Sequence, residues 1–400
     1  MEPLPVPPQL GDRRLFPTLE ARAYLNHAAI SPASSRVQAA VAEIARDYAT
    51  RGVGALSRWL DQRERLRASL AALLGADPSE LGYVANTTAG VRAIALCLPW
   101  RARDRVILLR GEFPANVTPW QRAAELYDLE LCWLSANDFF GAAGTGLAQL
   151  EQLLRAGARL VAVSAVQFQS GLRMPLAQIA ALCHAHGAEL FVDAIQAAGV
   201  VPLSVEALGI DYLSCGSHKW LMGLEGVGML YVRRPLAAAL RPVVAGWLSH
   251  QEGLRFLFEG AGHLRYDRPI RDQADFVEGG AAPGIVLAAL EAALEPIATL
   301  GVGAIFEHVQ RYHNALEPDL LARGFKSRRS PVPEQRSGIL SVDPPPGVNV
   351  LALHAGLAQR GVACTTPDGA LRFAPHWPNA LSEIDVVLGA VDEVLATSRS

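Results

Sequence analysis

Short apolar runs alternate with segments of helical period through the first two-thirds of this 400-residue chain. One such segment brings Leu176, Ile179 and Cys183 onto one face of a helix. Alternating strands and helices build a parallel sheet covered by helices on both faces. The last apolar run follows the previous one after a short turn, so we expect it to be antiparallel. The expected strands are Val106–Leu109, Leu129–Leu134, Leu160–Ala165, Leu190–Asp193, Tyr212–Cys215 and Met229–Val232.

A lysine follows one of these strands directly. The run Tyr212–Cys215 continues as Gly-Ser-His and then Lys219. Lysine is a poor strand residue, and open α/β sheets place their ligands at the carboxyl ends of strands. A lysine in a partly apolar pocket there has a lowered pKa and can form a Schiff base with an aldehyde. Taken alone, Lys219 would more often be a surface lysine in a loop.

Asp193 changes that balance, because it ends another buried-type strand earlier in the chain. Pyridoxal phosphate (PLP) needs such a pair: a lysine holds its aldehyde, and a carboxylate keeps its pyridine nitrogen protonated. The sequence here resembles the class V aminotransferase family of PLP enzymes, which includes cysteine desulfurases, isopenicillin-N-epimerase-like proteins and kynureninase. The resemblance rests on Asp-x-x-Gln, from Asp193 to Gln196, and on Ser-His-Lys, from Ser217 to Lys219.

The resemblance implies a fold-type-I PLP-dependent transferase. This is an α/β fold, with a large domain on a mainly parallel seven-stranded sheet and a small C-terminal α/β domain. We expect an N-terminal extension at residues 1–20, the PLP-binding domain at 21–285 and the small domain at 286–400. The family builds each active site from two subunits, so a homodimer is implied, with Glu278–Gly280 as the crossing point.

A helix begins after Ala85-Asn-Thr-Thr88, and its free backbone amides suit a phosphate. The ordinary use of Thr and Asn there is an N-cap. The family has a Thr-Thr element at this place, so Thr87 and Thr88 resemble contacts to the PLP phosphate. Ser217 and His218 directly precede the lysine and are further candidates for that role.

Phe113 lies in Glu-Phe-Pro-Ala-Asn, which resembles a family element whose aromatic ring stacks on the pyridine ring. Many desulfurases have histidine at this place, and a phenyl ring cannot transfer protons. In the family's arrangement Gln196 reaches the PLP phenolate oxygen. Gln167 is a weaker candidate on the cofactor side.

Arg372 lies in Arg-Phe-Ala-Pro-His, which resembles a family signature near the C-terminus. An arginine in a short strand facing the cleft suits a bidentate grip on an α-carboxylate. Alone, it would more often be a solvated surface residue. The segment Tyr-Leu-Asn26-His27-Ala resembles the family's N-terminal element, so Asn26 and His27 are candidates for the substrate side.

Three departures from the family pattern bear on the reaction. Glu225 stands in a turn where relatives often have Pro-Lys-Gly, and Ala281 replaces a threonine that reaches the partner's phosphate. Cys364 is in a strand-like setting close to Arg372, whereas desulfurases carry their nucleophile on a flexible loop. We therefore expect Cys364 to pack in the core.

These features favour a PLP enzyme that acts on an α-amino acid through a Lys219 Schiff base, with transamination as the first choice. The alternatives are a C–S lyase or desulfurase-like enzyme and an amino-acid epimerase. A non-catalytic binding protein with the same fold is a rival from another class, but Lys219, Asp193 and Arg372 argue against it.

Composition limits the partners. The net charge is −3 with no long basic run, which argues against a nucleic-acid partner. No apolar stretch is long enough for a transmembrane span, and the first residues lack the pattern of a signal peptide. The five cysteines are scattered and the histidines show no metal-binding spacing. We expect a cytoplasmic protein with no metal, no membrane partner and a small amino-acid substrate.

Overall fold

The computed structural model describes residues 6–397 and contains a seven-stranded main sheet. Only β8 runs antiparallel to its neighbours, β2 and β7. The mainly parallel sheet and the antiparallel last strand are thus confirmed. In sheet order the strands are β2 (Leu81–Val84), β8 (Gly228–Val232), β7 (Tyr212–Gly216), β6 (Glu189–Asp193), β5 (Leu160–Ser164), β3 (Arg105–Arg110) and β4 (Glu130–Ser135).

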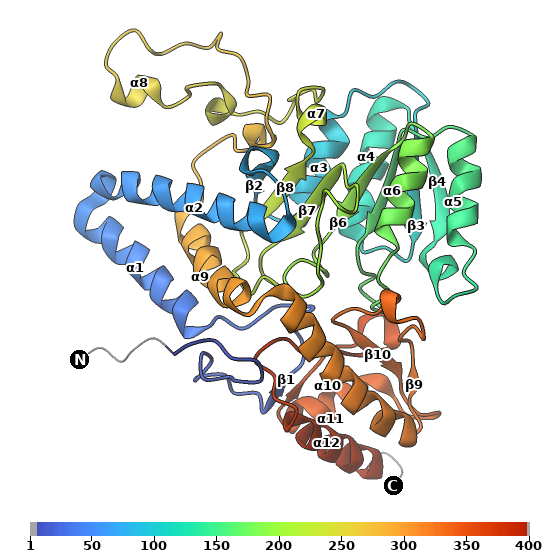
Figure 1. Cartoon of the computed structure of the whole chain (residues 1–400). Helices are drawn as coiled ribbons and strands as arrows, with labels where there is room; N and C mark the ends of the chain where they lie inside the picture. Colours follow the sequence, from blue (N-terminus) through green and yellow to red (C-terminus); the bar gives the residue numbers. More distant parts are fainter. Residues whose placement is uncertain (1–5, 398–400) are drawn as a thin grey trace.

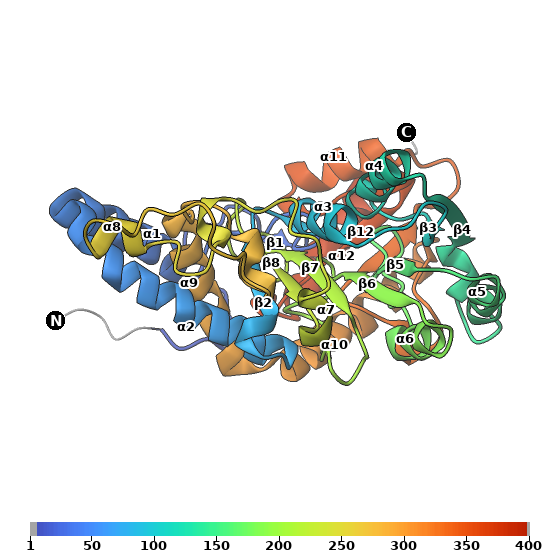
Figure 2. The ribbon, with the colours of Figure 1, turned by 90° about the horizontal axis from the view of Figure 1, so that it is seen from above.

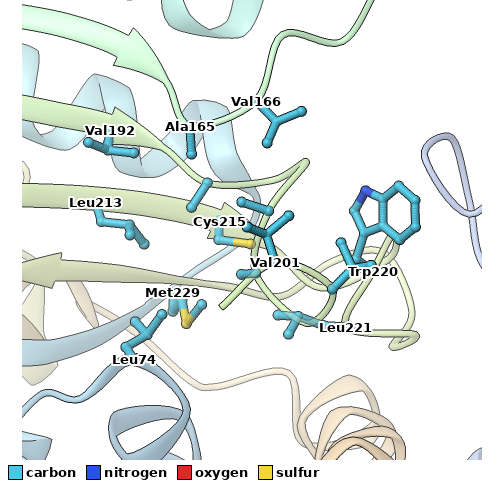
Figure 3. Packing of buried hydrophobic residues seen from close by; sticks show 14 of the residues in the cluster. Leu74, Ala165, Val166, Val192, Val201, Leu213, Cys215, Trp220, Leu221 and Met229 are labelled. Carbon is cyan, nitrogen blue, oxygen red and sulfur yellow. The ribbon is translucent and has the colours of Figure 1, made fainter. Parts of the chain in front are cut away.

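Helices cover both faces of this sheet, as the buried central strands require. Val161 and Val163 of β5 face one apolar cluster, and Leu160 and Ala162 face another on the opposite side. Figure 3 shows part of the first cluster, where side chains of neighbouring strands point the same way. The helices that contribute to these two clusters include α3 (Thr87–Cys97), α4 (Thr118–Tyr127), α5 (Gly146–Arg155) and α6 (Leu176–Ala185).

Three long helices gather at one end of the molecule (Figures 1 and 2). They are α1 (Ser35–Arg51), α2 (Leu56–Leu74) and α9 (Gly284–Leu300), and α9 packs against the other two. The segment from Gly246 to Gly280 lies at the same end and is mostly irregular. It contains only the short helices η5 (Trp247–Ser249), α8 (Arg255–Phe258) and η6 (Ala274–Val277).

The C-terminal part forms a second unit with its own apolar cluster. Its three-stranded antiparallel sheet has the order β12-β10-β9. The elements are α10 (Val302–Ala322), β9 (Lys326–Ser327), β10 (Leu340–Asp343), α11 (Val350–Gln359), β11 (Val362–Ala363), β12 (Leu371–Phe373) and α12 (Glu383–Thr397). Figure 1 shows these orange and red segments beneath the main sheet.

The two ends of the chain meet in this second unit. Strand β1 (Ala23–Tyr24) pairs in parallel with β11, and Ala23 and Leu25 belong to the C-terminal cluster. Helix α9 instead packs in the cluster of the main sheet. The division at residues 20 and 285 stays a prediction, and the packing crosses it at both places. Residues 1–5 of the expected N-terminal extension lie outside the described part of the chain.

Over residues 6–397, no single helix is both long enough and apolar enough to cross a membrane; α9 and α10 meet the criterion only together, as a pair bent by 78°.

Gly199 is required where the chain passes close to the backbone beside Lys219. Its φ is +100°, and a Cβ there would lie 2.4 Å from the Trp220 carbonyl oxygen. Gly187 has a φ of +73° but open space around it. We expect Gly187→Ala to lower the free energy of unfolding by roughly 1–2 kcal/mol through backbone strain alone. Gly199→Ala should cost roughly 1–3 kcal/mol more, because a main-chain atom must move.

Urea unfolding of both variants measures this difference. Equal losses of stability would show that the close approach to Trp220 does not constrain residue 199.

Candidate active site

A cleft of about 480 Å³ lies beyond the carboxyl ends of the parallel strands. Parallel sheets place ligands at this edge. A larger cavity of about 690 Å³ lies between α2, α8 and α9 and contains none of the expected site residues. The smaller cleft is therefore the candidate active site, on chemistry rather than on size. Its lining is Ala28, Ala29, Ile30, Asn86, Thr87, Thr88, Phe113, Ala115, Phe168, Asp193, Ile195, Gln196, His218, Lys219, Glu225, Pro367 and Arg372.

Lys219 lies in the loop after β7, and its main chain is held by a distant segment. The Ser31 hydroxyl donates to the Lys219 carbonyl over 2.6 Å. The Lys219 Nζ lies 5.5 Å from the centroid of the Phe113 ring. Burial lowers the pKa of Lys219 to about 8, opposed by the attraction of Asp193 and aided by the positive charge of Arg372. A large share of the side chain is therefore a neutral, nucleophilic amine near pH 8.

Asp193 ends β6 and is 1% exposed. Its Oδ1 accepts a hydrogen bond from the Ile195 amide at 2.9 Å, while its Oδ2 is buried and has no hydrogen-bond partner among the described residues. Burial raises the pKa of Asp193 to about 7. An unpartnered carboxylate oxygen that lines a cleft calls for a donor from a ligand. The protonated nitrogen of a pyridine ring meets that need, so this side of the cleft fits PLP.

The N-terminus of α3 supplies the polar end of the cleft. The Asn86 side chain caps the helix by accepting a hydrogen bond from the Ala89 amide, so the ordinary N-cap role is present here. Thr87 is buried, and its Oγ1 accepts the Gly216 amide at 2.9 Å, which ties α3 to the end of β7. Thr88 is exposed in the cleft. Free amides and hydroxyls at a helix N-terminus fit a phosphate.

Of the two residues before the lysine, only His218 reaches the cleft. Burial and the adjacent Lys219 lower its pKa. The Ser217 hydroxyl points elsewhere: it donates to the carbonyls of Val227, at 2.9 Å, and Leu224. Ser217 is thus a structural residue of the turn after the lysine and is not among those that line the cleft, which corrects its expected role at the phosphate.

Phe113 and Gln196 both line the cleft. Phe113 is 44% exposed and meets the edge of Phe168 at 5.3 Å between centroids and an interplanar angle of 84°. The Gln196 amide donates to the Ala28 carbonyl and accepts from the Trp220 indole, at 3.0 and 2.8 Å, which leaves one amide hydrogen for a ligand.

Gln167 is not brought to the cleft. Its amide nitrogen donates to Glu112 over 2.9 Å. Glu112 is buried and also accepts the Ser164 amide at 2.7 Å, so the three residues form a network behind the cleft. The weaker candidate on the cofactor side is therefore a structural residue.

Arg372 projects from β12 of the C-terminal unit into the cleft and is 4% exposed. Its Nη1 donates to the Phe168 carbonyl at 2.8 Å, and its Nε is buried without a hydrogen-bond partner among residues 6–397. Burial lowers the pKa of Arg372 to about 10, so the side chain stays charged at neutral pH. A fixed guanidinium with an unused N–H fits a carboxylate.

Asn26 and His27 do not line the cleft, which corrects their expected place beside the substrate. His27 is buried, and its Nδ1 lies 2.7 Å from the Ser31 hydroxyl. Because that hydroxyl donates to the Lys219 carbonyl, His27 is the donor in this pair. Burial holds the pKa of His27 well below its usual value. Asn26 pairs with Ala374, and the residues after His27 reach the cleft instead.

The cleft residues that sequence reasoning missed include Ile30, Phe168, Glu225 and Pro367. Phe168 follows β5 closely, as Lys219 follows β7, so the strand-end rule was a signal for it. Ile30 and Pro367 come from the two ends of the chain and had no such signal. Glu225 was noticed only as a departure from the family turn.

The cysteine near Arg372 is a core residue. Cys364 is 4% exposed in the C-terminal cluster, and burial raises the pKa of its thiol to about 12. Within residues 6–397, no cysteine lines the cleft, and no group of three or more His, Cys, Asp or Glu residues is placed to hold a metal ion.

The chain is similar in sequence and fold to known proteins. The chain is 27% identical to an uncharacterized aminotransferase, YcbU, of Bacillus subtilis over 96% of both sequences, and 32% identical to the cysteine desulfurase of Enterobacter sp. strain 638 over 80% of this chain and 77% of that one. A structure of a C-DES variant with glycine covalently linked to the PLP cofactor superposes with a TM-score of 0.86 at 22% identity, covering 95% of this chain and 98% of that one. A complex of the cystine C–S lyase C-DES with its product, cysteine persulfide, superposes with a TM-score of 0.84 at 21% identity, covering 93% of this chain and 97% of that one.

The family model of class-V aminotransferases matches residues 23–371, most of the chain. The same segment holds Lys219, Asp193 and the N-terminus of α3, and the fold is that of PLP-dependent enzymes. The chain therefore belongs to the class-V aminotransferase family and is a PLP-dependent enzyme.

Proposed function

We propose that this enzyme transaminates an α-amino acid and that Lys219 is the amine that binds the cofactor aldehyde. The observation that carries the proposal is the cleft itself. It brings together an amine of lowered pKa, a buried carboxylate with an unpartnered oxygen and a fixed guanidinium, with no cysteine in its lining.

Each of these three residues has a distinct task. Asp193 accepts a hydrogen bond from the pyridine nitrogen and keeps it protonated. Arg372 grips the substrate α-carboxylate through its unused N–H groups and so orients the bond to be broken. Lys219, with its lowered pKa, would move a proton at the substrate Cα. When bound, PLP supplies the electron sink for this chemistry.

The remaining residues position the cofactor. Thr87, Thr88 and His218, with the amides of α3, hold the phosphate. Gln196 directs its free amide hydrogen to the phenolate oxygen. Phe113 covers one face of the ring by stacking, which its position 5.5 Å from the Lys219 amine supports.

The second candidate reaction is C–S bond cleavage. It is supported by the similarity of the chain to a cysteine desulfurase and to the cystine C–S lyase C-DES. A desulfurase needs a thiolate that can reach the substrate sulfur, and Cys364 is buried with a pKa raised to about 12. A lyase that releases the sulfur without a cysteine acceptor stays compatible with the cleft. Epimerisation is disfavoured, because Phe113 cannot return a proton from the face that it covers.

Product analysis separates these reactions. Transamination converts an amino acid and a 2-oxo acid acceptor into the exchanged pair, and it consumes no sulfur. C–S cleavage of cysteine or cystine releases sulfide or persulfide. Release of either as the main product, with no exchange, would replace transamination by lyase chemistry.

We propose that the enzyme is a homodimer of the cytoplasm. Exposed apolar residues gather on the segment between Gly246 and Gly280, beside the larger cavity; they include Trp247, Leu257, Phe258 and Tyr266. Ala281 lines that cavity rather than the cleft, as a subunit crossing point would. All five cysteines are free, which suits a reducing compartment.

Sedimentation at micromolar concentration should show a dimer. A fully active monomer would contradict the proposed homodimer.

The chain has only two lysines, Lys219 and Lys326, which makes the attachment site easy to map. Lys326 lies exposed on β9. We expect borohydride reduction of the PLP-loaded protein to fix the cofactor on the Lys219 peptide, as measured by mass spectrometry. Lys326→Ala should label normally, whereas Lys219→Ala should not label. Label on the Lys326 peptide of the native protein would refute the assignment.

The pKa of Lys219 predicts how cofactor capture depends on pH. The neutral amine reacts, so the rate at which apoprotein captures PLP should rise about tenfold per pH unit below 8 and level off above it. Asp193 raises this pKa and Arg372 lowers it. Asp193→Asn should therefore move the inflection to lower pH, and Arg372→Gln to higher pH.

Stopped-flow absorbance measures the two inflections. Shifts of both variants in the same direction would contradict the electrostatic coupling of these three groups.

Arg372 and Cys364 lie near each other in the chain but should respond differently to substitution. Loss of a charge-assisted grip costs roughly 2–3 kcal/mol, so Arg372→Ala should raise the KM for the amino acid by roughly 30- to 150-fold. Cys364→Ala should leave steady-state activity within about twofold. A Cys364→Ala variant that loses sulfide release from cysteine, present in the native enzyme, would identify a desulfurase instead.

A further inference from the structure

Three apolar side chains form a wall at the end of the cleft that holds Arg372. Phe168 is joined to Arg372 through its carbonyl, 2.8 Å from Nη1. Pro367 lies in the turn between Thr365 and Arg372, whose main chains are paired. Ile30 closes the wall from the N-terminal segment, which pairs with the chain just after β12. All three residues therefore line the same cleft as Arg372, to which the proposed function assigns the substrate carboxylate.

This apolar wall, made by Ile30, Phe168 and Pro367, is held in place before any ligand binds. The Tyr24 hydroxyl donates to the Ile30 carbonyl over 2.6 Å. The Phe168 ring is in T-shaped contact with the Phe113 ring. The next residues on both sides are joined as well, since the Gln169 amide donates to the Asp368 carboxylate at 2.9 Å. A preformed apolar surface binds an apolar side chain without the cost of ordering it.

Among the described residues that line the cleft, no positively charged side chain remains to pair with a second carboxylate of the substrate. Of the described residues that line it, the fixed cations are Lys219 and Arg372, which the proposed function assigns to the cofactor and the α-carboxylate. His218, with its lowered pKa, is neutral at pH 7. Glu225 is exposed in the lining and repels anions. A side-chain carboxylate would therefore be desolvated without a partner, which is costly.

We propose that the substrate is a neutral α-amino acid with an aromatic or branched aliphatic side chain, which packs on the apolar wall, and that dicarboxylic amino acids are rejected. This inference rests on the proposed function, because it names the substrate of the same cleft.

The test uses the PLP-loaded wild-type enzyme. Its cofactor absorbance is followed as L-phenylalanine, L-leucine, L-alanine, L-aspartate or L-glutamate is added. We expect kcat/KM for phenylalanine or leucine to exceed that for alanine by about tenfold or more, and that for the two dicarboxylic acids by about a hundredfold. An aspartate-first, glutamate-first or alanine-first order overturns the inference alone. No change with any amino acid overturns the proposed function as well.

Phe168→Ala tests the wall directly, because the carbonyl that holds Arg372 belongs to the main chain and is retained. We expect the phenylalanine-to-alanine ratio of kcat/KM to fall toward one. The matched control is Phe140→Ala, a half-exposed phenylalanine that is not part of the cleft lining, which should keep the wild-type ratio. An unchanged ratio in a folded Phe168→Ala enzyme would refute the wall, and the wild-type profile decides the substrate class even where a variant fails to fold.

Discussion

The main chain around Lys219 is held by hydrogen bonds from both ends of the polypeptide. Ser31 donates to the Lys219 carbonyl, and His376 bonds the Trp220 carbonyl over 2.9 Å. The Trp377 amide donates to Nδ1 of His376, so Nε2 carries the proton, and the pKa of His376, lowered to about 4 by burial, keeps the ring neutral. The reactive loop is therefore complete only when the N-terminal and C-terminal segments have both packed on the main sheet.

These hydrogen bonds fix the main chain around Lys219, which explains why the site can keep buried polar groups that lack hydrogen-bond partners. Asp193 Oδ2 and Arg372 Nε are buried without a hydrogen-bond partner in the described part of the chain, and each such group costs about 1–3 kcal/mol. A mobile loop would relieve that cost by exposing them to water. Here Asp193 ends β6, Arg372 lies within β12 and both are buried, so a ligand of matching charge completes them. The same rigidity keeps Lys219 desolvated and its pKa low.

The identity of the reaction depends on a few departures from the family pattern. Phe113 places an aromatic ring where a proton-transferring histidine stands in many desulfurases, and Cys364 lies in the C-terminal core rather than in the cleft. Proton transfer at the substrate thus falls to Lys219, which suits transamination. The proposed apolar wall would add a preference for neutral side chains, since the proposed function assigns Arg372 to the α-carboxylate.

The sequence by itself determined the alternating α/β architecture, the cofactor and the strand-end residues Lys219 and Asp193. The architecture and the strand-end positions follow from local rules, because apolar period defines a strand and parallel strands bring their carboxyl ends to one edge. The cofactor follows from the Asp193 and Lys219 pair and from the resemblance that the motifs around them carry. Only the tertiary structure decided which neighbours of those residues face the cleft. Ser217 turned to the carbonyls of its own loop, and His27 turned into the core to hold Ser31, because a polar side chain points to whichever partner the packed backbone offers. The proposed substrate end of the cleft was likewise beyond sequence reasoning, since its lining includes Ile30 and Pro367 from opposite ends of the chain.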